Sequence, residues 1–124
     1  MLHDRLRQLP ASGLAADATV LHAGTVRARL LGLAMIGPSQ LPAGHALLLR
    51  PCSSIHTFGM RFPVDVAFAA ADGTVLRVIR GVPPRRVRRC PSAAVALEAH
   101  AGELGRFLLD GRGAGSRLAV PLVE

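Results

Sequence analysis

Short apolar runs separated by turn residues recur along most of the chain. We expect strands at residues 19–22, 46–49, 54–58, 64–70, 74–79, 93–99 and 117–123. The Asp72-Gly73 pair lies between two of these runs, and Asp-Gly in that position is a strong signal for a β-hairpin. Many short strands at this spacing are typical of a mainly β domain, so the pattern predicts a compact antiparallel sandwich or barrel.

A helical periodicity begins after Thr25. Val26, Leu30 and Leu33 follow one another at helical spacing, with arginines between them, which predicts a short amphipathic helix. Thr25 is a suitable N-cap, and the Gly-Pro pair at 37–38 would end the helix. The domain is therefore mainly β, with one or two short helices.

The first part of the chain lacks this regularity. Pro10 and Gly13 interrupt any periodicity, so we expect residues 1–18 to be a flexible lead-in to a single domain at 19–124. Residues 103–109 predict one or two helical turns inside that domain. No apolar run approaches the roughly 20 residues of a membrane-spanning helix, and the start lacks the apolar core of a signal peptide. These observations predict a cytoplasmic protein.

The charge of the chain is strongly basic. Fifteen cationic side chains, all of them arginine, oppose 8 acidic ones, for a formal net charge of +7. Compositional bias in the coding sequence would explain the absence of lysine. A surface for anions is the alternative, because the guanidinium group matches phosphate and carboxylate. The chain has no Trp or Tyr, so the stacking platform of sequence-tolerant nucleic-acid binders is hard to build.

Arginines are most concentrated at residues 77–89. No acidic residue lies between Asp72 and Glu98, and the Pro83-Pro84 pair stiffens the segment, so several guanidinium groups could point outward together. A solvated basic loop is the alternative, and no motif of RNA or DNA readers accompanies it. The candidate anion-binding residues are Arg85, Arg86, Arg88 and Arg89.

Reactive and hydrogen-bonding side chains are concentrated between Pro51 and Asp65. Asp65 lies in an apolar, strand-like segment, where a carboxylate needs a charged partner or several hydrogen-bond donors. We predict that Arg29 is this partner, with Arg61 as the second choice. The carboxylate either ties strand to helix or takes part in a binding or catalytic site.

His56 is the candidate acid–base group of this stretch, with Asp65 as its partner. Ser54 would share a strand face with His56, which is the beginning of a hydrolase triad. The chain lacks the Gly-x-Ser-x-Gly nucleophile elbow, however, and no oxyanion turn is evident. We therefore do not expect serine chemistry.

The two cysteines, Cys52 and Cys90, each stand next to a proline at the expected start of a strand. They are either two buried, inert thiols or a redox pair. On an extended segment Cys52 and His56 lie too far apart to share a metal ion, so a zinc site would have to add Cys90 and His100. We expect neither a metal nor a cofactor.

Three segments together resemble the domain-of-unknown-function family 192 (DUF192). Residues 29–33 are similar to its Arg-x-x-Gly-Leu segment, 56–65 to its central Met…Pro-x-Asp block in the version that begins His-Thr-Phe, and 96–102 to its Leu-Glu-x-x-x-Gly segment. Two features depart from the family: Phe-Gly-Met-Arg-Phe replaces the central Trp-Met-Lys-Asn-Thr of many members, and Gly115-Ser116 replaces a Gly-Asp pair. The resemblance implies a small, mostly β prokaryotic domain with no established activity.

The sequence thus supports three functional hypotheses. The first is a non-enzymatic ligand-binding or accessory module with a pocket walled by the 51–65 stretch. Its polar anchors would be Arg29, His56, Arg61 and Asp65. The second is a small enzyme that uses His56 and Asp65 as an acid–base pair. The third is an anion or nucleic-acid binder that uses the 77–89 segment, so the expected partner is a small molecule, a protein or a nucleic acid.

Overall fold

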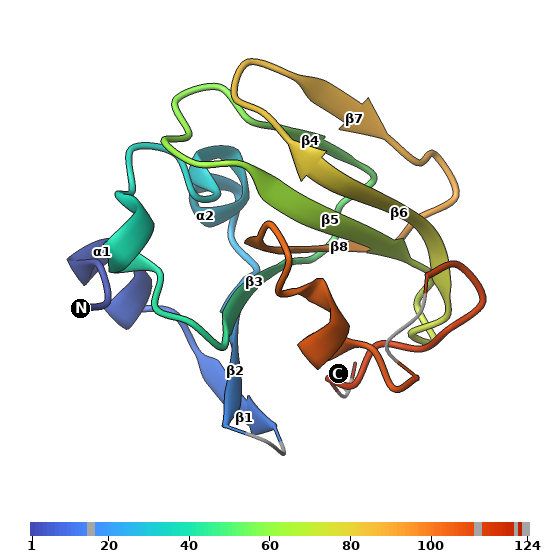
Figure 1. Cartoon of the computed structure of the whole chain (residues 1–124). Helices are drawn as coiled ribbons and strands as arrows, with labels where there is room; N and C mark the ends of the chain where they lie inside the picture. The colour runs from blue at the N-terminus through green and yellow to red at the C-terminus, as the bar shows by residue number, and fades with distance from the viewer. Residues whose placement is uncertain (15–16, 111–112, 121, 123–124) are drawn as a thin grey trace.

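The computed structural model describes residues 1–14, 17–110, 113–120 and 122 (Figure 1). Its strands are β1 (Ala11–Leu14), β2 (Ala18–Ala23), β3 (His45–Leu49), β4 (Ser54–His56), β5 (Val64–Ala69), β6 (Val75–Val82), β7 (Val87–Arg89) and β8 (Val95–His100). Its helices are α1 (Asp4–Arg7) and α2 (Val26–Leu31), with 3-10 turns η1 (Pro38–Gln40) and η2 (Leu104–Phe107). Six strands form one sheet in the order β1-β2-β3-β8-β5-β6, and β4 and β7 form a separate pair.

The mainly β prediction is confirmed. Of the two expected architectures, the closed barrel is excluded because the six-stranded sheet stays open. Contrary to the prediction, the sheet is not entirely antiparallel, because β2 and β3 run parallel. The chain leaves the end of β2, passes through α2 and η1, and returns to the start of β3, and a parallel pair needs such a crossover. The other neighbouring pairs of this sheet are antiparallel, as expected.

Local signals in the sequence place several elements correctly. The predicted hairpin is confirmed, since β5 and β6 pair antiparallel around Asp72, whose Oδ1 accepts from the Thr74 amide at 2.9 Å. Thr25 caps α2, as predicted, by accepting from the Ala28 amide at 3.0 Å. Near the end of the chain, residues 117 and 118 make only isolated β-bridges, and residues 121 and 123 of the predicted last strand lie outside the described residues.

The predicted apolar face of α2 is wrong. Val26 is 63% exposed and Leu30 is 65% exposed, although Leu33 is fully buried. The helix ends at Leu31, and Gly32 takes a φ of +50°, so the chain leaves the helical spiral before Leu33. A helix of six residues is too short to carry an apolar stripe into the core, and its exposed apolar residues Val26 and Leu30 line a pocket instead.

Residues 1–14 form α1 and β1 and contact the rest of the domain, whereas their composition predicted a flexible lead-in. Leu6 on α1 is fully buried, and Arg5 donates to the Gly32 carbonyl at 2.9 Å. β1 adds an edge strand to β2. Pro10 lies between α1 and β1 and does not prevent either element from forming.

The large sheet is covered on both faces, and its central strands are buried on both. Alternating side chains of β5 and β8 point to opposite faces. On one face, here called the α2 face, the core contains Leu47, Val66, Phe68 and Ala96. On the other, the η2 face, it contains Leu48, Ala67, Leu97 and Ala99. Figure 1 places α2 and the β4–β7 pair on one side of the sheet and η2 on the other.

None of the helices in the described ranges is long and apolar enough to cross a membrane.

Candidate functional site

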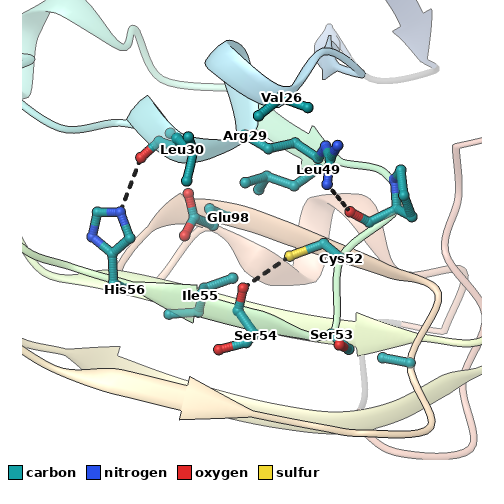
Figure 2. A pocket seen from close by; sticks show the side chains of 13 residues that line it. Val26, Arg29, Leu30, Leu49, Cys52, Ser53, Ser54, Ile55, His56 and Glu98 are labelled. Carbon is teal, nitrogen blue, oxygen red and sulfur yellow. Dashed lines mark hydrogen bonds between the residues drawn. The ribbon is translucent and has the colours of Figure 1, made fainter.

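A pocket of about 470 Å³ opens between α2 and β4, above β3 and β8 (Figure 2). This volume is in the range of small-molecule binding sites. Its apolar walls include Val26, Leu30, Leu49, Ile55 and Ala93. Its polar lining residues are Arg29, Cys52, Ser53, Ser54, His56 and Glu98.

Glu98 is the polar group at the floor of this pocket. Its side chain is 1% exposed, and its Oε1 has no hydrogen-bond partner among the described residues. On β8 it pairs with Leu47 on one side and Val66 on the other, which places it on the α2 face. A Cβ on Gly32 would lie 3.6 Å from Oε1, so the carboxyl reaches the end of α2. Burial raises the pKa of Glu98 to about 8.

Arg29 on α2 faces the same pocket. Its Nη1 donates to the Pro51 carbonyl at 3.1 Å, which ties α2 to the loop after β3 (Figure 2). Its Nε is buried and, like Glu98 Oε1, has no hydrogen-bond partner among the described residues. One cationic and one acidic side chain thus each bring an unpartnered buried atom to one pocket.

His56 on β4 closes one end of the pocket and is fully engaged. Its Nδ1 accepts from the Phe58 amide at 3.2 Å, and its Nε2 lies 2.9 Å from the Leu30 carbonyl oxygen. Nε2 must therefore carry the proton, and the imidazole is neutral in this arrangement. The ring holds the end of α2 against β4, as Figure 2 shows.

Both cysteines are free thiols. Cys52 lines the pocket and donates to the Ser54 carbonyl at 3.1 Å, and burial raises the pKa of its thiol. Cys90 is buried in the core of the α2 face. Their segments are adjacent, since the Cys90 amide donates to the Ser53 carbonyl at 2.9 Å. Whether the two thiols act as a redox pair stays a prediction.

No three His, Cys, Asp or Glu side chains of the described residues gather to hold a metal ion. His100, which a zinc site would have recruited, stacks on Phe62 with ring centroids 4.3 Å apart. Its Nε2 lies 2.7 Å from the Leu41 carbonyl oxygen.

Asp65 does not contact Arg29, so this prediction is wrong. Its Oδ1 accepts from the Gly81 amide at 2.8 Å and its Oδ2 from the Gly102 amide at 2.9 Å, with Arg80 Nη1 at 3.6 Å. The reason lies in the strand parity: Asp65 shares the face of Ala67 on β5, which is the η2 face. The sheet therefore separates it from α2.

The other predicted anchors are also placed apart. Arg61 is exposed and does not line the pocket. His56 lies on the α2 face, so His56 and Asp65 do not form the acid–base pair that the sequence suggested. Of the four predicted anchors, Arg29 and His56 line the pocket together. The carboxyl group of the pocket comes from Glu98 and not, as predicted, from Asp65.

Glu98 was missed as a site residue, although a signal was present. It lies in Val-Ala-Leu-Glu-Ala-His, an apolar strand segment with one carboxylate, as Asp65 does in its own strand. The argument that a buried carboxylate needs partners applies to both residues. Which of the two faces α2 depends on the side of the sheet to which its side chain points. That side is known only once the pairing register of the strands is known.

The predicted Arg-rich loop at 81–89 is only in part a loop: residues 83–86 form a tight turn between β6 and β7, and Arg88 and Arg89 lie on β7. Thr57, which is fully buried, holds this turn: its Oγ1 donates to the Pro83 carbonyl at 2.6 Å and accepts from the Arg86 amide at 2.8 Å. Arg88 is half-buried, and the other three predicted anion-binding residues, Arg85, Arg86 and Arg89, are exposed.

Comparison with known proteins gives the family. The model of DUF192, described as an uncharacterized ACR, matches residues 8–113, and the chain belongs to this family. The resemblance seen in the sequence is thereby confirmed. No curated protein matches the chain.

Two solved structures share the fold. One is a candidate transcription regulator from Sinorhizobium meliloti 1021, with 22% identity, a TM-score of 0.66, and coverage of 87% of this chain and 88% of that chain. The other is a protein of unknown function from Novosphingobium aromaticivorans DSM 12444, with 11% identity, a TM-score of 0.63, and coverage of 94% and 97%. Both are similar to this chain in fold.

Proposed function

We propose that this DUF192 chain is a non-enzymatic ligand-binding module and that the pocket between α2 and β4 is its binding site. One observation carries the proposal: Glu98 and Arg29 both line this pocket, and each has a buried atom, Oε1 and Nε respectively, without a hydrogen-bond partner among the described residues. Buried polar groups in native proteins are nearly always hydrogen-bonded. A ligand bound in the pocket could supply the hydrogen-bond partners that these two groups lack.

The arrangement of the other side chains supports binding better than turnover. Both ring nitrogens of His56 and both oxygens of Asp65 have hydrogen-bond partners within the protein. An acid–base pair needs groups that can exchange a proton with a substrate. The small-enzyme alternative therefore has less support than the binding module.

A mass spectrum of the freshly purified full chain under non-denaturing conditions, followed by a fragment screen by NMR, tests this proposal. We expect a retained small molecule, or fragments whose shift changes cluster at the pocket. Ala93→Trp, which fills the pocket, should abolish binding, and Ser92→Trp, on the exposed neighbouring residue, should not. Fragments that bind only elsewhere, or no binding at all, would overturn the proposal.

Anion binding by the turn between β6 and β7 is a second candidate function. The observation that favours it is the fixed backbone: Thr57 makes hydrogen bonds to both sides of the turn, so Arg85 and Arg86 extend from a defined position. A pinned turn lowers the entropy that its arginines lose on binding.

A further inference from the structure

The charge of the pocket favours one class of ligand. Arg29 is a cation, whereas the Cys52 thiol has a pKa raised by burial and His56 is neutral in its observed hydrogen bonds. Burial raises the pKa of Glu98 to about 8, so its carboxyl group is mostly protonated at neutral pH. The pocket therefore carries a net positive charge and favours an anionic group.

Two residues that line this pocket can supply hydrogen-bond donors. Arg29 Nε carries a proton with no acceptor among the described residues, and a protonated Glu98 carboxyl can donate as well. We propose that the ligand is a small monocarboxylate with an apolar body, whose carboxylate accepts from Arg29 Nε and from the Glu98 carboxyl group. This inference rests on the binding function proposed above.

Other polar groups fit these two donors less well. A primary amine would lie close to the Arg29 guanidinium and would require Glu98 to ionise while 1% exposed. A phosphate would bring more charged acceptor oxygens than Arg29 and Glu98 can serve. A carboxylate offers two oxygens to two donors, and its hydrogen bond from the guanidinium is charge-assisted.

The apolar walls indicate the rest of the ligand. Val26 and Leu30 are largely exposed at the mouth of the pocket, and Leu49, Ile55 and Ala93 line it further. An alkyl or branched body would cover these side chains. Each methylene group that leaves water should tighten binding about fourfold, until the pocket is full.

A matched set of probes tests the ligand class. Hexanoate, hexylamine and hexanamide share one carbon skeleton, and each is titrated into the isotope-labelled full chain by NMR at about pH 6 and about pH 9. We expect hexanoate to bind most tightly, with shift changes at α2, β4 and β8. Its affinity should fall about tenfold between the two pH values, because Glu98 loses its proton as the pH passes about 8.

The titratable groups that line the pocket beside Glu98 are Arg29, Cys52 and His56. His100 lies two residues further along the same strand, held near the Leu41 carbonyl. The Glu98→Gln variant distinguishes the effect of Glu98 titration from that of the other groups, since the amide keeps a hydrogen-bond donor but cannot titrate. It should retain hexanoate binding within a fewfold and lose the pH dependence above about pH 7.

Variants of α2 test the cation. Arg29→Gln should weaken hexanoate binding about tenfold or more, because a charge-assisted hydrogen bond is lost. Arg27→Gln removes the same charge from an exposed residue of the same helix that does not line the pocket, and should leave the affinity nearly unchanged. Amide spectra of each variant verify the fold.

The outcomes separate this inference from the proposed function. Tighter binding of hexylamine or hexanamide at the pocket would overturn the carboxylate inference and leave the binding function standing. Hexanoate binding that Arg29→Gln leaves intact, or that ignores pH in the unsubstituted chain, would also overturn it. If no probe and no fragment binds at the pocket, both proposals fall together.

Discussion

The amide of Gly102 donates to Asp65 Oδ2 at 2.9 Å, which ties the turn after β8 to the start of β5. The other carboxylate oxygen accepts from the Gly81 amide at 2.8 Å, inside β6 where its register with β5 shifts. Asp65 thus joins the turn after β8 to the irregular part of β6 on the η2 face, and we infer that its role is structural.

Asp65→Asn should lower the free energy of unfolding by about 1–3 kcal/mol, because the amide nitrogen would face a backbone N–H and leave that buried donor unpaired. Urea denaturation followed by circular dichroism measures the loss. Asp4→Asn is the matched control on an exposed ion pair and should leave the midpoint nearly unchanged. Equal stability of both variants would contradict the role given to Asp65.

Glu98 should make the stability of the fold depend on pH. The pKa of its carboxyl is raised from 4.5 to about 8 in the folded state, so the folded protein binds this proton more tightly than the unfolded chain does. The stabilisation is therefore complete below about pH 4.5 and is lost as the pH rises toward and through about 8. The slope should be roughly 1 kcal/mol per pH unit in that window.

The measurement is urea denaturation of the protein and of Glu98→Gln across this window. The difference in unfolding free energy between the two should change steadily between about pH 5 and about pH 8, since the amide does not titrate. A constant difference would contradict the prediction, because it would mean that the Glu98 carboxyl is already ionised in the folded protein at about pH 5.

Thr57→Val should destabilise the protein by about 2 kcal/mol, because it leaves the Pro83 carbonyl and the Arg86 amide without the hydroxyl partner that the buried Thr57 supplies. Thr57→Ser keeps the hydroxyl and should recover most of this loss. Thermal unfolding reports the stability, and hydrogen exchange at Arg86 should accelerate in the Val variant alone. Unchanged exchange there would show that the turn is held by other contacts.

Anion binding by the turn predicts that the protein binds heparin and that the affinity falls steeply with salt concentration. Arg86→Ala with Arg89→Ala should weaken this binding more than Arg7→Ala with Arg27→Ala, which removes the same charge from exposed positions elsewhere. Fluorescence titration at several salt concentrations measures both. Equal losses in the two double variants would assign the effect to net charge, not to the turn.

Much of the fold follows from local signals in the sequence. The Asp72-Gly73 turn and the Thr25 cap act through nearby backbone, so the sequence alone places β5, β6 and α2. The parallel β2–β3 pair and the packing of Leu6 depend on contacts between distant segments, which local pattern does not encode.

The candidate site was predicted only in part, because its residues come from segments that are distant in the sequence. Arg29 was identified as the expected partner of Asp65, which it does not contact, and His56 was identified as a candidate acid–base group of the 51–65 stretch. Asp65 and Glu98 look alike by that criterion, each a carboxylate in a buried strand. Only the sheet register assigns Glu98 to the face of α2 and Asp65 to the opposite face.

The helix over the pocket buries none of its own side chains, whereas Glu98 lies in the middle of a buried strand. The two walls of the pocket therefore differ in local stability. Opening of α2 should cost much less free energy than global unfolding, while exposure of the floor should require loss of the whole sheet. Substitutions on α2 can thus alter the shape of the mouth while the chemistry of the floor is kept. A fold divided in this way can diverge in the ligands it admits without placing its own folding at risk.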